Sequence, residues 1–199
     1  MKGTLTRRSV ARPALLTGAL LLAALPAVGV RAAGAVTNEL IPSVGLTRAV
    51  HGDRATTGDA RLSLRTTWLP MLKTDLGVGY RDDQFDGGTV RMRSWPITAS
   101  LWVSPFANMP STRMSRFLGL YAGGGVGFYN ETTRYSFNAP LTNLGTEKFG
   151  EHVGAGYEVP VTGPLGLDLN ARYIWLQKSG LGEVNRDNWN TTLGLAVKF

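Results

Sequence analysis

The chain has 199 residues, enough for one domain with its own core. It contains no cysteine, which excludes disulfide bridges and thiolate–metal sites as supports of the fold. The formal net charge is +7, but five of the 21 basic residues and none of the 14 acidic ones lie within residues 1–35, so the remainder carries a net charge of +2. The basic balance of the whole chain is therefore no argument for binding to nucleic acid.

Residues 1–35 have the layout of a secretory signal peptide, with a basic start, an apolar stretch over 19–25 and small residues after it. Ala33-Gly34-Ala35 offers a cleavage motif, and Ala32 is a rival cleavage point. The apolar stretch is far shorter than the ~20 residues that a spanning helix needs, which disfavours a membrane anchor. We therefore expect residues 1–35 to be removed on export and residues 36–199 to form the mature domain.

From residue 39 onward, apolar and polar residues alternate with the period of a half-buried β-strand. The pattern is clearest at the end of the chain, where Leu193, Leu195 and Val197 alternate with Gly194 and Ala196. Eight such segments follow one another, at 39–50, 60–69, 74–82, 89–104, 116–131, 149–159, 165–177 and 188–199. Short links alternate with longer polar loops at 51–59, 83–88, 132–148 and 178–187. This order predicts an all-β, eight-stranded antiparallel up-and-down barrel.

Two kinds of barrel fit this order, and they differ in which face is polar. A lipocalin-like barrel would have an apolar interior, whereas an outer-membrane barrel has an apolar outside and a polar lumen. The polar face here is poor in lysine and rich in glycine, serine and threonine, unlike a surface in water. Aromatic residues of the apolar face stand near strand ends, as in an interfacial girdle: Trp68, Tyr80, Phe128, Tyr157, Trp175, Trp189 and Phe199. We therefore predict a transmembrane barrel with short periplasmic turns and longer extracellular loops.

The stretch LYAGGGVGFYN at residues 120–130 is rich in glycine. A phosphate-binding loop would place its glycines at a strand-to-helix turn, but these glycines recur with the period of a strand and no helix follows. We expect them to form one lumen wall that leaves space for large side chains such as Arg61, Arg65, Trp102 and Arg172. The predicted wall consists of Gly119, Gly123, Gly125, Gly127, Gly154 and Gly156.

Charged residues of both signs occur at the inward positions of the strands. Such charges in a narrow lumen should form ion pairs, because an unpaired buried charge is unfavourable. We expect Asp168 to lie opposite Lys198, with Glu158 beside them, and the lumen to be plugged rather than open. A narrow channel for small solutes is the alternative. The predicted network comprises Arg61, Arg65, Asp75, Arg81, Glu158, Asp168, Arg172 and Lys198, and the same alternation also assigned Glu151 to it.

The segments YAGGGVGFYN, HVGAGYEVPVTGPLGLDLNARYIWL and TLGLAVKF resemble the small outer-membrane β-barrel proteins of Gram-negative bacteria, the OmpA/OmpX/OmpW-like set. The resemblance covers most of the mature chain and implies location in the outer membrane. It further implies that the C-terminal Phe199 is the signal read by the outer-membrane assembly machinery. It says little about activity.

Some eight-stranded outer-membrane barrels modify lipid A, a reaction that needs a nucleophile with a base, usually Ser with His. Only His51 and His152 are available here, and Ser136 is the serine nearest to His152 in the sequence. We expect both histidines to be rim residues, and we expect no enzymatic activity, cofactor or metal. A lipid A-modifying enzyme remains a distant third possibility.

We predict a monomeric protein with a structural or surface-interaction role and no nucleic-acid partner. Its partners would be outer-membrane lipid and lipopolysaccharide. Basic loop residues are expected to contact lipopolysaccharide phosphates: Arg54, Arg134, Lys148 and Arg186.

Overall fold

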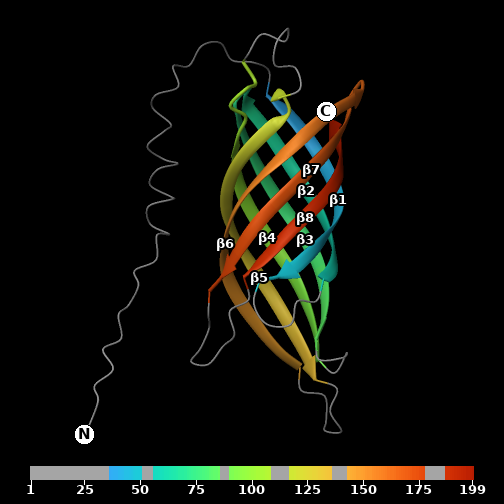
Figure 1. Ribbon diagram of the computed structural model, residues 1–199, viewed down its shortest axis with the longest axis vertical. Coiled ribbons are helices and arrows are strands. Elements are labelled where there is room, and N and C mark those ends of the chain that lie inside the picture. Colours follow the sequence, from blue (N-terminus) through green and yellow to red (C-terminus); the bar gives the residue numbers. More distant parts are fainter. Residues whose placement is uncertain (1–35, 51–55, 86–89, 109–116, 136–142, 178–186) are drawn as a thin grey trace, which may run out of the picture. The chain divides into compact units, whose positions relative to one another are not determined.

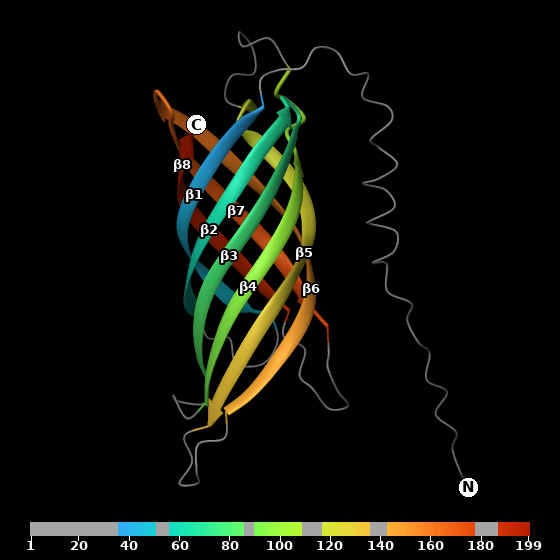
Figure 2. The same ribbon diagram turned by 180° about the vertical axis from the view of Figure 1, so that it is seen from behind.

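A computed structural model of the chain describes residues 36–50, 56–85, 90–108, 117–135, 143–177 and 187–199. These residues form a closed barrel in which each strand pairs with its sequence neighbours and the last strand pairs with the first (Figures 1 and 2). The strands are β1 Thr37–Ala49, β2 Thr56–Leu69, β3 Leu72–Phe85, β4 Val90–Val103, β5 Leu120–Tyr135, β6 Asn143–Thr162, β7 Leu165–Leu176 and β8 Asn188–Lys198. The predicted eight-stranded up-and-down barrel is confirmed.

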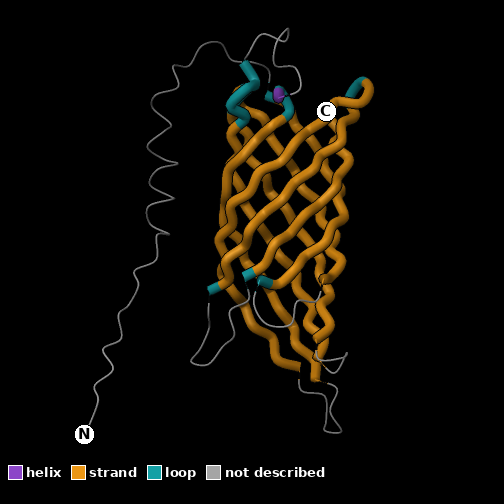
Figure 3. Tube along the Cα trace, viewed as in Figure 1, coloured by secondary structure: helices purple, strands orange, loops and turns teal. Residues whose placement is uncertain are grey.

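Almost all of the described chain is strand (Figure 3). Within this part of the chain, no helix is long and apolar enough to cross a membrane. The predicted signal peptide, residues 1–35, lies outside the described residues, as does His51.

Alternation along each strand separates an apolar outside from a polar inside. On β7, Leu167 and Leu169 are exposed on the outside, whereas Asp168, Asn170 and Arg172 are buried inside. Large apolar side chains are exposed in the same way on the other strands, and most buried residues are polar or charged. This distribution is the reverse of that in a soluble barrel and is typical of one whose outer surface faces lipid.

The two ends of the barrel differ in their connections. Tight turns join β2 to β3 and β6 to β7, and Gly163 in the second turn has a φ of +52°, a conformation that glycine adopts readily. Both chain ends of the barrel meet at this turn end, where the Phe199 amide donates to the Asn38 carbonyl at 2.9 Å. The connection between β4 and β5 at this end, residues 104–119, is longer than the other two.

The strands at the loop end are longer than the sequence pattern predicted. β5 continues to Tyr135 and β6 begins at Asn143, so most of the segment predicted as a loop at 132–148 is a paired β-ribbon. Figures 1 and 2 show this ribbon extending beyond the ends of β1, β7 and β8. Alternation of apolar residues marks only the part of a strand that faces lipid, and polar continuations lack that signal.

Two prolines coincide with interruptions in the strand pairing. Pro42 lies on β1, whose pairing with β8 is interrupted between Leu40–Val197 and Ser43–Gly194. Pro96 lies on β4, whose pairing with β3 is interrupted between Val78–Ile97 and Arg81–Ser94. Proline has no amide hydrogen to donate to the ladder, which accounts for a local loss of pairing.

Candidate functional site

The lumen is filled by successive layers of charged and polar side chains. At the turn end, the Glu158 carboxylate accepts from Lys198 Nζ at 2.7 Å and from Lys73 Nζ at 2.9 Å. Lys198 Nζ also lies 3.6 Å from Glu39 Oε1. These four residues come from β1, β3, β6 and β8, so the layer connects strands on several sides of the barrel.

The next layer centres on Asp168 of β7. Arg65 Nη1 donates to Asp168 Oδ2 at 2.7 Å, and the Tyr121 hydroxyl donates to the same oxygen at 2.8 Å. The Tyr121 hydroxyl in turn accepts from Asn170 Nδ2 at 3.1 Å. The Arg65 guanidinium also lies over the Tyr121 ring, 4.7 Å from its centroid. Arg65 is only 1% exposed, so this layer consists of direct contacts between buried side chains.

Three arginines surround Asp75 in the layer after that. Arg61 Nη2 lies 3.1 Å from Asp75 Oδ1, Arg65 Nη2 lies 3.6 Å from Oδ2, and Arg172 Nη2 lies 3.9 Å from Oδ1. The Arg172 guanidinium also lies 4.9 Å from the ring centroid of Trp102, a side chain with no exposed surface. The middle of the barrel is therefore filled by large side chains as well as by ion pairs.

The loop end of the lumen contains a further pair and a small cavity. Lys148 Nζ lies 3.7 Å from Glu131 Oε2, and both residues are buried. A cavity of about 30 Å³ lies on the turn side of this pair. Its lining includes Asp59, Arg81, Ser94, Tyr129 and Asn190.

The structure corrects three sequence-based placements. Asp168 pairs in register with Gly194 rather than lying opposite Lys198, and it contacts Arg65 instead. Glu151 pairs with Val126 and Trp175, which places it on the outer face. Lys148, predicted in a loop that contacts lipopolysaccharide, is buried in the lumen. The first two errors have the same origin. Alternation shows that successive residues face opposite sides of the sheet, but it does not show which of them face the lumen or which residues of other strands they contact.

His152 is also misplaced by the sequence analysis, since it is 2% exposed inside the lumen rather than at the rim. Its Nε2 lies 2.9 Å from the Ser100 hydroxyl, and the centroids of the imidazole and the Trp102 ring are 6.3 Å apart. The serine that contacts His152 is thus Ser100 of β4, whereas Ser136 lies outside the described residues. Among the described residues, His152 Nδ1 has no hydrogen-bond partner, so none of their carboxylates orients the ring as in a catalytic triad.

The predicted glycine wall lies along β5 and β6, with one member, Gly119, just before β5. A methyl group added at Gly156 would collide with the ring of Tyr121, its register partner on β5. Methyl groups at Gly123 and Gly125 would collide instead with backbone carbonyls of β4. Close approach of strands therefore excludes side chains at some positions, and a filled lumen excludes them at others. The same test gives a collision at each of the remaining wall positions, Gly119, Gly127 and Gly154.

Several network members were not found from the sequence, among them Glu39, Lys73, Tyr121 and Glu131. Each of them occupies an inward position in the alternation of its strand, and that alternation is the sequence signal that could have identified them. On the outer face, the predicted girdle residues Trp68, Phe128, Trp175, Trp189 and Phe199 are exposed. In the described part of the chain, no group of three His, Cys, Asp or Glu residues is arranged to hold a metal ion.

An apolar exterior, a charged interior and a closed antiparallel sheet define the class as the transmembrane β-barrels. No protein-family model and no curated protein sequence matches the chain. Solved structures do: the attachment invasion locus protein Ail of Yersinia pestis superposes with a TM-score of 0.55 at 10% identity, covering 82% of this chain and 98% of that one.

Two further structures have the same architecture. Neisserial surface protein A, NspA, gives a TM-score of 0.52 at 15% identity over 85% of this chain and 100% of that one. A major outer-membrane protein of Thermus thermophilus gives 0.55 at 13% identity over 83% and 100%. The chain therefore has the fold of the small outer-membrane β-barrel proteins, as the resemblance implied.

Proposed function

We propose that this protein is an integral, non-enzymatic protein of the bacterial outer membrane, whose lumen is closed by ion pairs and whose role is structural or lies in interactions at the cell surface. The observation that carries the proposal is the connected set of buried contacts from Lys73 and Glu158 through Arg65 and Asp168 to Asp75. Arg65 Nη1 lies 3.8 Å from Glu158 Oε2, which joins the turn-end layer to the central one.

Burial argues against a hydrolase based on Ser100 and His152. A substrate ester would have to reach a serine that is only 6% exposed inside the lumen. In the part of the chain that the structure describes, no carboxylate bonds to the imidazole to hold the catalytic tautomer. We therefore assign this pair a packing role in the lumen.

The two ends of the barrel differ in the length of their connections. This difference supports an orientation with the turn end in the periplasm and the loop end outside the cell. The extended β5–β6 ribbon would then stand outside the membrane, where it supports a role in surface interaction. Phe199 ends the last strand with its ring exposed, which supports recognition by the assembly machinery. Lipopolysaccharide remains the proposed lipid partner. Arg54 and Arg186, which were predicted to contact its phosphates, lie outside the described residues. Arg134, predicted for the same contact, pairs with Arg91 in the β4–β5 register.

Single-channel recording tests the closed lumen. Protein produced from the full chain should give no steady conductance in planar bilayers, although a heat-dependent gel shift shows that it is folded. A variant with both Arg65→Ala and Trp102→Ala, which removes two large lumen side chains, should conduct and so shows that the assay detects an open barrel. Steady conductance of the unmodified protein that changes with Asp168→Asn would instead establish the alternative function, a narrow channel for small solutes.

A further inference from the structure

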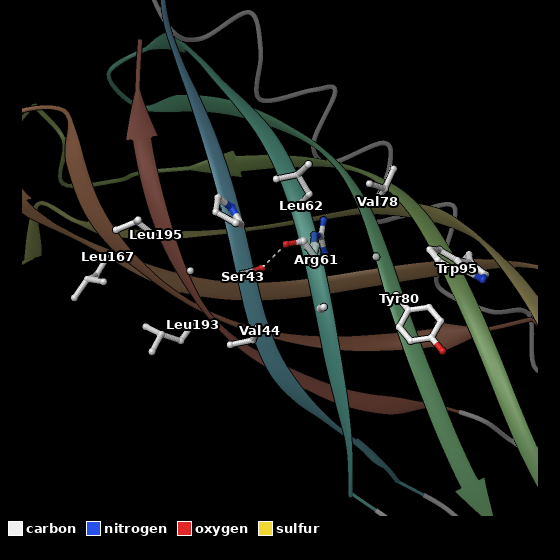
Figure 4. Close-up of a pocket in the computed structure, with 14 residues that line it drawn as sticks. Ser43, Val44, Arg61, Leu62, Val78, Tyr80, Trp95, Leu167, Leu193 and Leu195 are labelled. Atoms are coloured by element: carbon white, nitrogen blue, oxygen red, sulfur yellow. Dashed lines mark hydrogen bonds between the residues drawn. The ribbon is translucent and has the colours of Figure 1, made fainter.

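The outer wall of the barrel has a hollow of about 680 Å³, and Arg61 is the one member of the lumen network among its lining residues (Figure 4). It extends over β1, β2, β3 and β8, with contributions from β4 and β7. Its walls are formed mainly by apolar outward side chains, including Val44, Leu62, Val78, Tyr80, Trp95 and Leu193. The hollow therefore lies within the part of the surface that faces lipid hydrocarbon.

Small residues on β2 account for the hollow. Ala60 stands between Val44 of β1 and Tyr80 of β3 in the register, so a one-carbon side chain is flanked by two larger ones. The next outward residue toward the loop end is Gly58, where an added methyl group would meet no atom within 4 Å. Gly58 itself is not one of the lining residues of the hollow. The pairing of β1 with β8 is interrupted at Pro42, which lines the hollow, and the pairing of β3 with β4 is interrupted at Pro96, next to the lining residue Trp95.

A charged cluster stands at the loop end of this groove. Tyr80 and Trp95 pack with ring centroids 4.7 Å apart, and the Tyr80 hydroxyl donates to Asp82 Oδ2 at 3.1 Å. One outward position further along the strands, Arg91 Nε donates to Asp82 Oδ1 at 2.7 Å and Arg93 Nε lies 3.4 Å from Asp82 Oδ2. Two arginines share one carboxylate, which leaves the cluster with a net positive charge.

These arginines differ from those of the lumen in their access to solvent. The side chains of Arg91 and Arg93 are 45% and 36% exposed, whereas those of Arg65 and Arg172 are at most 4% exposed. Guanidinium groups recognise phosphate oxygens with paired hydrogen bonds. A phosphate group next to this cluster would therefore meet accessible donors at the level where an aromatic girdle marks the membrane interface.

We propose that the groove binds one acyl chain of lipid A and that Arg91 and Arg93 contact a phosphate of the same molecule. The assignment rests on the proposed outer-membrane location, in which the loop end adjoins the leaflet that contains lipopolysaccharide. Charge complementarity selects an anionic lipid over a neutral or zwitterionic one. It also disfavours a second copy of the chain, because a symmetric contact through this face would bring the two positive clusters together.

Native mass spectrometry of the full-length protein in detergent micelles tests this assignment with phosphorylated lipid A, phosphatidylglycerol and phosphatidylethanolamine as probes. Ala60→Phe fills the groove, and the double change Arg91→Gln and Arg93→Gln removes the charge. Ala122→Phe on β5 and Arg48→Gln on β1 are the matched controls, since both residues are outward and exposed but lie outside the groove and the cluster.

The expected result is that lipid A binds in preference to both phospholipids. Each test variant should weaken the binding of lipid A about tenfold. This is the loss expected when one charge-assisted hydrogen bond, or apolar contact of similar free energy, is removed. The control variants should bind lipid A as the unmodified protein does. Equal binding of the three lipids, or equal losses in the test and control variants, would overturn the assignment. A dimer abolished by Ala60→Phe would assign the groove to a second copy and would overturn it as well.

Membrane fractionation separates this result from the proposed function. Protein that fractionates with the outer membrane but shows no preference for lipid A would overturn the lipid A site alone. Folded protein absent from that fraction would overturn the proposed location, on which the site depends.

Discussion

Arg65 and Asp168 are separated by 103 residues in the sequence, and their side chains meet at 2.7 Å inside the barrel. Arg65 comes from β2 and Asp168 from β7, strands that do not pair with each other. The contact therefore spans the lumen and joins two walls that backbone hydrogen bonds connect only indirectly. Tyr121 of β5 bonds to both residues and adds a third wall to the same contact.

Replacing Asp168 by Asn should destabilise the barrel by about 3–5 kcal/mol, because Arg65 would lose its closest anionic partner in a buried site. The matched change Asp82→Asn affects an exposed ion pair on the outer surface and should have a much smaller effect. Urea unfolding in micelles, followed by tryptophan fluorescence, measures both changes. Equal midpoints for the two variants would contradict a stabilising role for the lumen network.

Glycine at position 156 should be required because the Tyr121 ring occupies the space of a side chain there. Gly156→Ala is expected to destabilise the barrel by about 1–3 kcal/mol, the range found for overpacked interiors. Gly58→Ala is the control, since its added methyl group meets nothing within 4 Å. The temperature of the gel shift compares the two variants, and a loss in Gly58→Ala as large as that in Gly156→Ala would count against the steric explanation.

The Asp82 carboxylate, which lies beyond the aromatic rings at the loop end of the lipid-facing surface, should remain ionised at a lower pH than an ordinary aspartate. Hydrogen bonds from Arg91 lower its pKa, with a smaller contribution from Tyr80, and together they outweigh the opposing effect of burial. The pKa of Asp82 is lower in the folded state than in the unfolded state. The Asp82–Arg91 pair therefore stabilises the fold at pH values above the unfolded-state pKa, and this stabilisation is lost as the pH falls through the folded-state pKa. A ¹³C NMR titration of the carboxyl group measures this pKa. Arg91→Gln should raise it, and an unchanged titration would exclude Arg91 as the cause.

The exposed aromatic ring of Phe199 should matter for assembly more than for the finished barrel. Its backbone is bonded to Asn38, so Phe199→Ala retains the amide donor of that hydrogen bond while removing the ring. We expect slower appearance of the heat-modifiable form in cells and a nearly unchanged urea midpoint once the protein is folded. Phe199→Tyr should assemble at the normal rate. Normal assembly of the alanine variant would contradict a recognition role for the ring.

The fold was predictable because lipid on one side and ion pairs on the other impose a period of two on each strand. That period placed Leu167 outside and Asp168 inside from the sequence alone. It could not identify Arg65 as the partner of Asp168, because register depends on loop geometry and on contacts made across the closed barrel. On β6, the predicted inward position of Glu151 is wrong, because Glu151 pairs with the outward Val126 and Trp175.

The Ser100–His152 contact shows the same limit. Both residues were visible in the sequence, but 52 positions separate them, and only the pairing of β4 and β6 with β5 brings them together. The outer groove has an even weaker signal, because Ala60 and Gly58 are ordinary residues until the larger neighbours on β1 and β3 are known.

The unequal strand lengths give the loop end of the barrel an oblique rim. β7 ends level with Gly127 of β5, whereas β5 itself continues to Tyr135, roughly 27 Å farther along the strand and about 20 Å in height once tilt is included. In the proposed orientation, a large particle such as an antibody approaching from outside the cell would reach the strand ends of β5 and β6 before those of β7 and β8. Among the described strands, the ends of β5 and β6 are therefore more accessible from that side than the ends of β7 and β8.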